Sequence, residues 1–101
     1  MDPALPAGVA EVVIDLPEAR SLSADGIVTW TRGDRAFASM GDSGVEIRLD
    51  PAIAAAAMRT PDTAPSTRGG EWIRFDPREL DPHAMDRLRA WLELAYRRAA
   101  E

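Results

Sequence analysis

A chain of 101 residues that is 46% hydrophobic and 29% charged has the length and composition of one globular domain and is too short for two. The absence of cysteine excludes disulfide bonds and thiolate metal sites, and in a domain this small it favours the cytoplasm. The net charge of −5 disfavours nonspecific binding to nucleic acid, and no apolar run approaches the roughly 20 residues that span a membrane.

The first segment, residues 1–8, contains two prolines and a glycine, and we expect it to form a flexible lead-in. From Val9 onward, apolar residues follow the i, i+3, i+4, i+7 spacing of a short helix. Three of them are valines, whose β-branched side chains leave a strand open as the alternative. Pro17 ends the element in either case. This acidic start has no basic, apolar signal-peptide pattern, which again favours the cytoplasm.

Three strands are expected next, over residues 27–32, 35–40 and 45–49. The first is rich in Ile, Val, Thr and Trp, and short Gly- and Asp-containing turns separate the three. The third alternates apolar and charged side chains, so that Val45, Ile47 and Leu49 share one face. Because short turns join consecutive strands, the pairing is expected to be antiparallel.

The second half of the chain combines two helices with one more strand. Asp50-Pro51 and Asp81-Pro82 both have the chemistry of a helix start, since aspartate caps free N–H groups and proline is tolerated at the first position. The first of these helices should end at Thr60-Pro61. A polar loop over residues 60–70 then leads into a strand over residues 71–75, and an apolar stripe indicates a long final helix.

The expected order is therefore α-β-β-β-α-β-α. This order predicts a single α+β domain of two layers, with an antiparallel four-stranded sheet and helices on one face. Each strand then has one side in the core and one side outside it.

Catalytic and metal-binding patterns are absent from the sequence. His83 is the only histidine, and its place in the first turn of the last helix favours a solvated side chain over a general base. Zinc would need several carboxylates, and Asp42 with Glu46 does not match a calcium loop. We therefore expect a protein that is not an enzyme and that holds no metal or cofactor.

A candidate loop site consists of Ser66, Thr67 and Arg68, which precede two glycines. Hydroxyls, an arginine and glycine N–H groups can together cradle a phosphate. The loop has no Walker lysine and does not open a helix, so a flexible connection is the favoured interpretation.

A candidate binding face follows from strand alternation. If Ile73 and Phe75 face the helices, then Trp72 and Arg74 project from the opposite side. The same argument assigns five residues to this open face: Trp72, Arg74, Arg48, Arg35 and Phe37. Aromatic and arginine side chains suit a protein partner or stacked bases, and the acidic total favours protein. Cover by the N-terminal segment is the remaining alternative.

Several segments resemble the MmcQ/YjbR family. They are Arg32 to Ala38, Val45 to Pro51, Gly70 to Ile73, Ala95 to Ala100 and Leu16-Pro17, so that the resemblance spans about residues 9–100. It implies a compact two-layer α+β fold and, because members are often labelled DNA-binding, a DNA-binding role. The chain differs from the family in its short first helix and in having no lysine in the hairpin, where Asp34 stands close to the usual basic residue.

The sequence thus predicts a small non-catalytic domain that binds a protein or a second copy of itself through the open sheet face, with nucleic-acid binding as the alternative. Lysine, asparagine and glutamine are absent, and lysine and asparagine need A-rich codons. We therefore expect a GC-rich, bacterial source.

Overall fold

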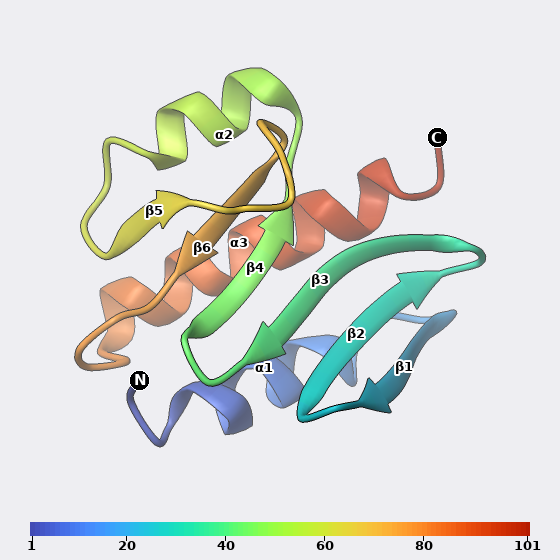
Figure 1. The fold of residues 1–101 in the computed structure, drawn as a ribbon, viewed down its shortest axis with the longest axis horizontal. Helices are drawn as coiled ribbons and strands as arrows, with labels where there is room; N and C mark the ends of the chain where they lie inside the picture. Colours follow the sequence, from blue (N-terminus) through green and yellow to red (C-terminus); the bar gives the residue numbers. More distant parts are fainter.

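The computed structural model describes residues 1–101 as one antiparallel sheet with helices packed behind it (Figure 1). Its elements are α1 (Leu5–Val13), β1 (Ala19–Ala24), β2 (Ile27–Arg32), β3 (Arg35–Gly41), β4 (Gly44–Arg48), α2 (Pro51–Ala57), β5 (Thr63–Pro65), β6 (Trp72–Phe75) and α3 (Pro82–Arg98). The strand order across the sheet is β1-β2-β3-β4-β6-β5. The predicted α+β class and antiparallel pairing are confirmed, but the sheet has six strands rather than four.

The two additional strands lie at the edges of the sheet. β1 has the sequence Ala-Arg-Ser-Leu-Ser-Ala, and it was not predicted because these residues have low β-propensity. It forms because Asp25 and Gly26 adopt φ angles of 54° and 78°, which is the backbone of a tight hairpin turn, and because it then pairs along its whole length with β2. β5 has only three residues and pairs with β6.

The N-terminal segment is more ordered than the sequence predicted. Helix α1 begins at Leu5 instead of Val9, with Pro6 in its first turn, and the side chain of Leu5 is fully buried. The Asp2 carboxylate accepts hydrogen bonds from the backbone N–H groups of Ala4, at 2.9 Å, and Leu80, at 2.6 Å. Residues 1–8 are therefore not a flexible lead-in, because they are tied to the segment that precedes α3.

Both predicted aspartate caps are present. The side chain of Asp50 accepts from the backbone N–H of Ala52 at 3.0 Å, and that of Asp81 accepts from the N–H of Ala84 at 2.8 Å. These caps fix where α2 and α3 start, at the first turns that the Asp-Pro pairs predicted. His83 is exposed in the first turn of α3.

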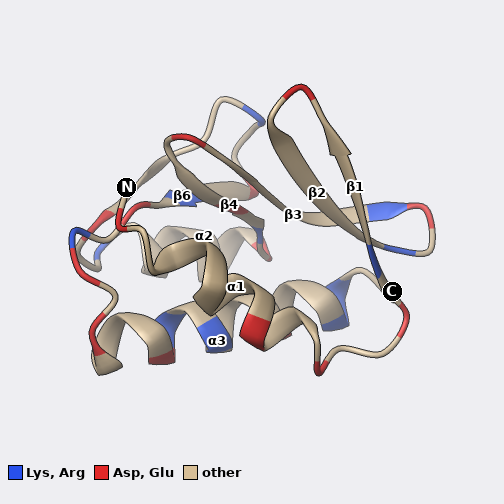
Figure 2. Cartoon of the chain, turned by 90° about the horizontal axis from the view of Figure 1, so that it is seen from below, with Lys and Arg blue, Asp and Glu red and all other residues tan.

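The core lies between the sheet and the pair of helices α1 and α3, which run along the same side of it (Figure 2). The side chains of Val45, Ile47 and Leu49 are completely buried, which confirms the alternation predicted for β4. Phe75 of β6 packs edge-to-face on Trp91 of α3, with ring centroids 5.2 Å apart. None of the helices has the length and hydropathy needed to span a membrane.

Candidate functional site

The side of the sheet opposite α1 and α3 faces the viewer in Figure 1, and no helix crosses its centre; we call it the uncovered face. Directly opposed residues of antiparallel strands project from the same side of a sheet, so the strand register identifies its members. One row crosses all six strands and consists of Leu22, Thr29, Ser39, Glu46, Arg74 and Ala64.

Trp72 and Arg74 project from the uncovered face, because Ile73 and Phe75 between and beside them are buried under the helices. Both side chains are half-buried. The guanidinium of Arg74 forms no ion pair, although it lies between Glu46 of β4 and Ala64 of β5 in the strand register. This aromatic and charged pair is thus partly accessible to solvent along β6.

Phe37 does not belong to the uncovered face. The register of β2 with β3 shifts between Trp30 and Thr31, so that Trp30 opposes Ala38 while Thr31 opposes Ala36. Phe37 is the extra residue of this β-bulge, which interrupts the alternation of side chains. Its ring is 1% exposed and packs edge-to-face against Tyr96 of α3.

Arg35 is also displaced from the predicted face, for the same reason. It opposes Arg32, whose guanidinium stacks on the Tyr96 ring at 4.1 Å on the helix side of the sheet. Arg35 lines a hollow of about 100 Å³ together with Arg98 at the end of α3. Strand alternation predicted the wrong side because the bulge lies two residues beyond Arg35.

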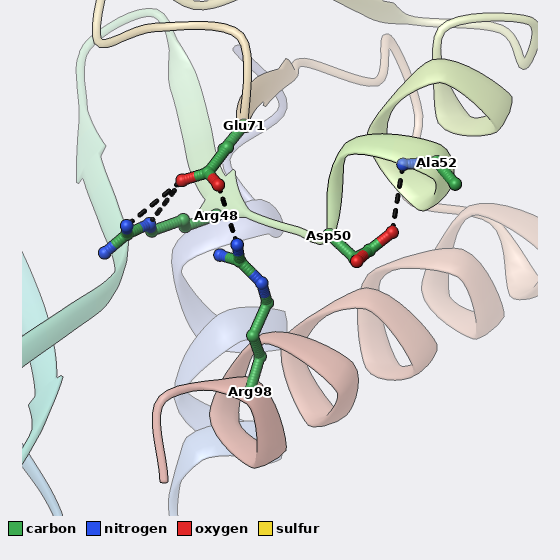
Figure 3. Close-up of polar contacts among 5 residues, drawn as sticks. All are labelled: Arg48, Asp50, Ala52, Glu71 and Arg98. Carbon is green, nitrogen blue, oxygen red and sulfur yellow. Dashed lines mark hydrogen bonds and ion pairs between the residues drawn. The ribbon is translucent and has the colours of Figure 1, made fainter. Parts of the chain in front are cut away.

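Arg48 lies at the rim of the sheet, where it belongs to an ion-pair network (Figure 3). Its guanidinium donates through Nε at 3.1 Å and through a terminal nitrogen at 3.0 Å to one carboxylate oxygen of Glu71. The other oxygen of Glu71 accepts from Arg98 of α3 at 2.7 Å. Hydrogen bonds from Arg98 and then Arg48 lower the pKa of Glu71 below its ordinary value of 4.5. Arg48 therefore joins the sheet to α3.

The loop of residues 66–70 folds onto the uncovered face through Arg68. Its guanidinium donates to the hydroxyl of Ser39 at 3.0 Å, forms an ion pair with Glu46 at 3.3 Å, and lies 5.1 Å from the ring centroid of Trp72. The hydroxyl of Ser66 donates to Glu46 and accepts from the backbone N–H of Arg68. Two of the three candidate loop residues, Ser66 and Arg68, thus contact the sheet, and Thr67 is exposed.

These contacts change the interpretation of the loop. The sequence indicated a flexible connection or a phosphate cradle, but the polar groups of Ser66 and Arg68 are directed at the Glu46 carboxylate. A carboxylate already occupies the position that an anion would take. The candidate loop and the candidate face, which the sequence treated separately, form one surface.

A groove of about 340 Å³ lies beside Trp72, between α2 and the 65–70 segment. Its walls are largely apolar and are formed by Pro51, Ala54, Ala55, Met58, Pro65, Ser66, Gly69, Gly70, Trp72 and Ile73. Met58 is 36% exposed, so the groove presents apolar surface to solvent. Sequence reasoning missed the role of α2, because only the fold brings residues 51–58 beside Trp72.

The opposite end of the uncovered face carries two exposed aliphatic side chains. Leu22 is 70% exposed and Ile27 is 42% exposed, and both project from the uncovered face of the β1–β2 hairpin. The Asp25-Gly26 pair was the signal that could have revealed this hairpin, since such dipeptides are typical of two-residue turns. Asp25, Asp42 and Glu46 surround a hollow of about 260 Å³ beside it.

The architecture places the chain in the class of two-layer α+β domains, with one face of an antiparallel sheet left without helices. Comparisons with known proteins found no matching family model, no similar curated protein and no similar solved structure. The resemblance to the MmcQ/YjbR family stays a prediction. No three His, Cys, Asp or Glu side chains come together in an arrangement that could hold a metal ion.

Proposed function

We propose that this chain is a non-catalytic protein-interaction domain that binds its partner at the Trp72 end of the uncovered face. The observation that carries the proposal is the combination of a half-exposed Trp72 in the wall of an apolar groove with an arginine, Arg74, that has no carboxylate partner. Tryptophan and arginine are the residues that most often dominate the binding energy of protein interfaces.

The chemistry of this surface defines the partner. The groove suits one apolar side chain, because its walls consist mainly of Pro, Ala, Met and Trp. Arg74 projects from the same face, two residues further along β6. It could therefore pair with a carboxylate of the partner that lies next to the apolar side chain in the groove. We therefore propose a partner segment that presents an apolar residue next to an aspartate or glutamate.

The charges on the uncovered face favour protein over nucleic acid. Of its arginines, Arg48 is paired with Glu71 and Arg68 is paired with Glu46, so that neither guanidinium is free for a phosphate. Asp25 and Asp42, which line the hollow beside Ile27 and form no ion pair, add negative charge to the same face. Phosphate contacts supply most of the affinity in nonspecific nucleic-acid binding, and this surface offers few.

The first step of the test is to identify the partner. A photoreactive amino acid in place of Met58, at the rim of the groove, should cross-link the partner in extracts of the source cells. The same amino acid in place of Ala90, which is exposed on α3, provides the control for nonspecific capture.

The second step is to titrate the identified partner by calorimetry. Trp72→Ala should weaken binding by about 30-fold, the size expected for a central interface residue. Arg74→Glu should weaken it further by reversing the charge, whereas Arg97→Glu, an exposed position on α3, should leave the affinity unchanged. Equal affinities for the wild type, Trp72→Ala and Arg74→Glu would refute the proposal.

A direct comparison with the nucleic-acid alternative uses the protein alone. We expect no binding to single- or double-stranded DNA or RNA at low salt. Binding that weakens steeply with added salt and is lost in Arg74→Ala would replace the protein-interaction proposal with a nucleic-acid one.

A further inference from the structure

We propose that two copies of this chain associate by antiparallel pairing of their β1 strands, which joins the two sheets into one. This inference does not depend on the proposed function, because it uses the free edge of β1 instead of the groove beside Trp72. The edge strand β1 is unusually open: five of its six residues are exposed, and Arg20 is its only charged residue. Natural edge strands are normally protected by charge, proline or short length.

The hairpin turn decides which backbone groups of β1 are free. The turn at Asp25-Gly26 closes on the pair Ala24–Ile27, whose backbone groups bond to each other. In an antiparallel ladder such bonded pairs alternate with pairs that do not bond. The N–H and C=O groups of Leu22 and Arg20 therefore point to β2, whereas those of Ser21 and Ser23 point outward from the sheet.

This alternation restricts how a second copy can pair. Residues whose backbone groups point outward must oppose each other across the interface. This condition is met when the two-fold axis passes between Leu22 and the second copy's Leu22. Ser21 then opposes the second copy's Ser23 and exchanges two hydrogen bonds with it, and the symmetric pair does the same. The two Leu22 side chains, each 70% exposed in the single chain, contact each other across the axis.

The same register avoids unfavourable charge contacts. Arg20 opposes the second copy's Ala24 rather than a second arginine, so no like charges meet across the interface. The serine hydroxyls oppose each other on the other side of the sheet, where Ser21 and Ser23 are both exposed. The sequence of β1 is thus complementary to its own antiparallel copy.

The opposite edge of the sheet explains why β1 pairs with the β1 strand of a second copy, and why assembly stops at two copies. Strand β5 has only three residues and ends in Pro65, which has no N–H to donate. A head-to-tail contact between β1 and β5 would extend into a polymer, but β5 offers too little backbone for it. Pairing of β1 with β1 uses the only long free edge of each copy and therefore closes as a dimer.

Sedimentation of the full chain over a range of concentrations tests the dimer. We expect a concentration-dependent rise to twice the monomer mass in the wild type and in Ser21→Ala. Ser21→Pro should remain monomeric, because it removes an outward N–H that β2 does not use. Leu22→Lys should also remain monomeric, because it places like charges on the axis. Trp72→Ala should still dimerise, which separates this contact from the partner groove.

Cross-linking tests the register, since the chain has no other cysteine. Residues that oppose each other in a non-bonded antiparallel pair have Cα atoms about 4.5 Å apart, which is within the range of a disulfide. Leu22→Cys should therefore oxidise to a covalent dimer. Arg20→Cys and Ala24→Cys should each form no covalent dimer when oxidised alone but should cross-link to each other when mixed.

Three results would overturn the inference. The first is a monomeric wild type at all concentrations, together with Leu22→Cys that oxidises no faster than Arg20→Cys. The second is a dimer that persists in both Ser21→Pro and Leu22→Lys. The third is a monomer whose β1 edge is protected from hydrogen exchange only when another protein is added.

Discussion

The side chain of Phe37 packs on Tyr96 because one extra residue in β3 turns it toward α3. Without the bulge, alternation along β3 would place this ring on the uncovered face beside Arg48. A single backbone irregularity therefore moves a large aromatic side chain from a candidate binding surface into the core. The same irregularity keeps Arg35 on the side of α3, at the rim of the domain.

Truncation of this ring should measure its contribution to the core. Phe37→Ala removes a side chain that is 1% exposed, and the free energy of unfolding should fall by about 3–5 kcal/mol. Arg35→Ala, two residues earlier and exposed, should change it by less than about 0.5 kcal/mol. Urea denaturation of the three proteins provides the comparison. A loss below about 1 kcal/mol for Phe37→Ala would contradict the packing of this ring against Tyr96.

At the scale of elements, the 66–70 loop is held on the sheet by Ser66 and, over a wider area, by Arg68. Arg68 contacts residues of three different strands, namely Ser39 of β3, Glu46 of β4 and Trp72 of β6. Ser39 is 1% exposed, so its hydroxyl would be left without a partner if Arg68 were removed. Arg68 therefore connects the loop to three strands of the sheet.

Arg68→Ala should release the loop. We expect faster amide exchange over residues 66–70 and a loss of about 1–2 kcal/mol in the free energy of unfolding, mainly from the unpaired Ser39 hydroxyl. The double variant Ser39→Ala/Arg68→Ala should lose less than the sum of the single variants, because the two residues share one contact. Thr67→Ala is the control, and equal exchange rates in the wild type and Arg68→Ala would contradict the proposed role of Arg68.

The Glu71 network couples the sheet to α3 in a pH-dependent way. Since its pKa is lower in the folded chain than its ordinary value of 4.5, the unfolded chain binds the proton first as the pH falls. The stabilising contribution is therefore present above pH 4.5 and is lost as the pH falls through the lowered folded value. This pH-dependent contribution should be absent from a chain that carries glutamine, a neutral amide, in place of Glu71.

Glu71→Gln should accordingly flatten the acid side of the stability profile. The free energy of unfolding of the wild type should decline more steeply than that of Glu71→Gln below about pH 5. Chemical denaturation between about pH 3 and 7 measures both profiles. Glu93→Gln, a carboxylate of α3 without an ion pair, is the matched control, and parallel profiles for wild type and Glu71→Gln would exclude a role for the network.

At the scale of the whole molecule, the first helix completes the core. Helix α1 lies beside α3 under the sheet, and Leu5, Val9 and Val12 are each at most 1% exposed (Figure 2). Gly8 faces the segment that precedes α3, and a Cβ atom at its position would lie 2.6 Å from the side chain of Leu80, so a larger residue would require Leu80 to move. The domain thus needs its first thirteen residues to close the apolar side of the sheet.

Deletion of residues 1–13 should prevent stable folding. Burial of three aliphatic side chains contributes about 1.5–3 kcal/mol each, and the sum is comparable to the whole stability of a small domain. Circular dichroism and urea denaturation of the truncated chain should show a noncooperative, largely unfolded protein. A truncated chain with the midpoint of the wild type would show that α1 is dispensable.

The sequence by itself determined the elements whose signals are local. Asp-Pro pairs located both later helices, and clean alternation in β4 and β6 identified Val45, Ile47, Ile73 and Phe75 as core residues. These predictions succeeded because hydrophobic periodicity and capping depend on near neighbours in the chain. The uncovered position of Trp72 and Arg74 followed from the same local alternation.

Only the tertiary structure decided which distant segments meet. The bulge at Phe37 arises from the pairing of β3 with β2, and β1 forms a strand because it pairs with β2 in a hairpin. The segment before α1 is held by the hydrogen bond between Asp2 and the backbone N–H of Leu80. Likewise, the fold places the 66–70 loop on Glu46 and α2 beside Trp72. Local patterns carry no information on such contacts, because their energies come from residues far apart in the sequence.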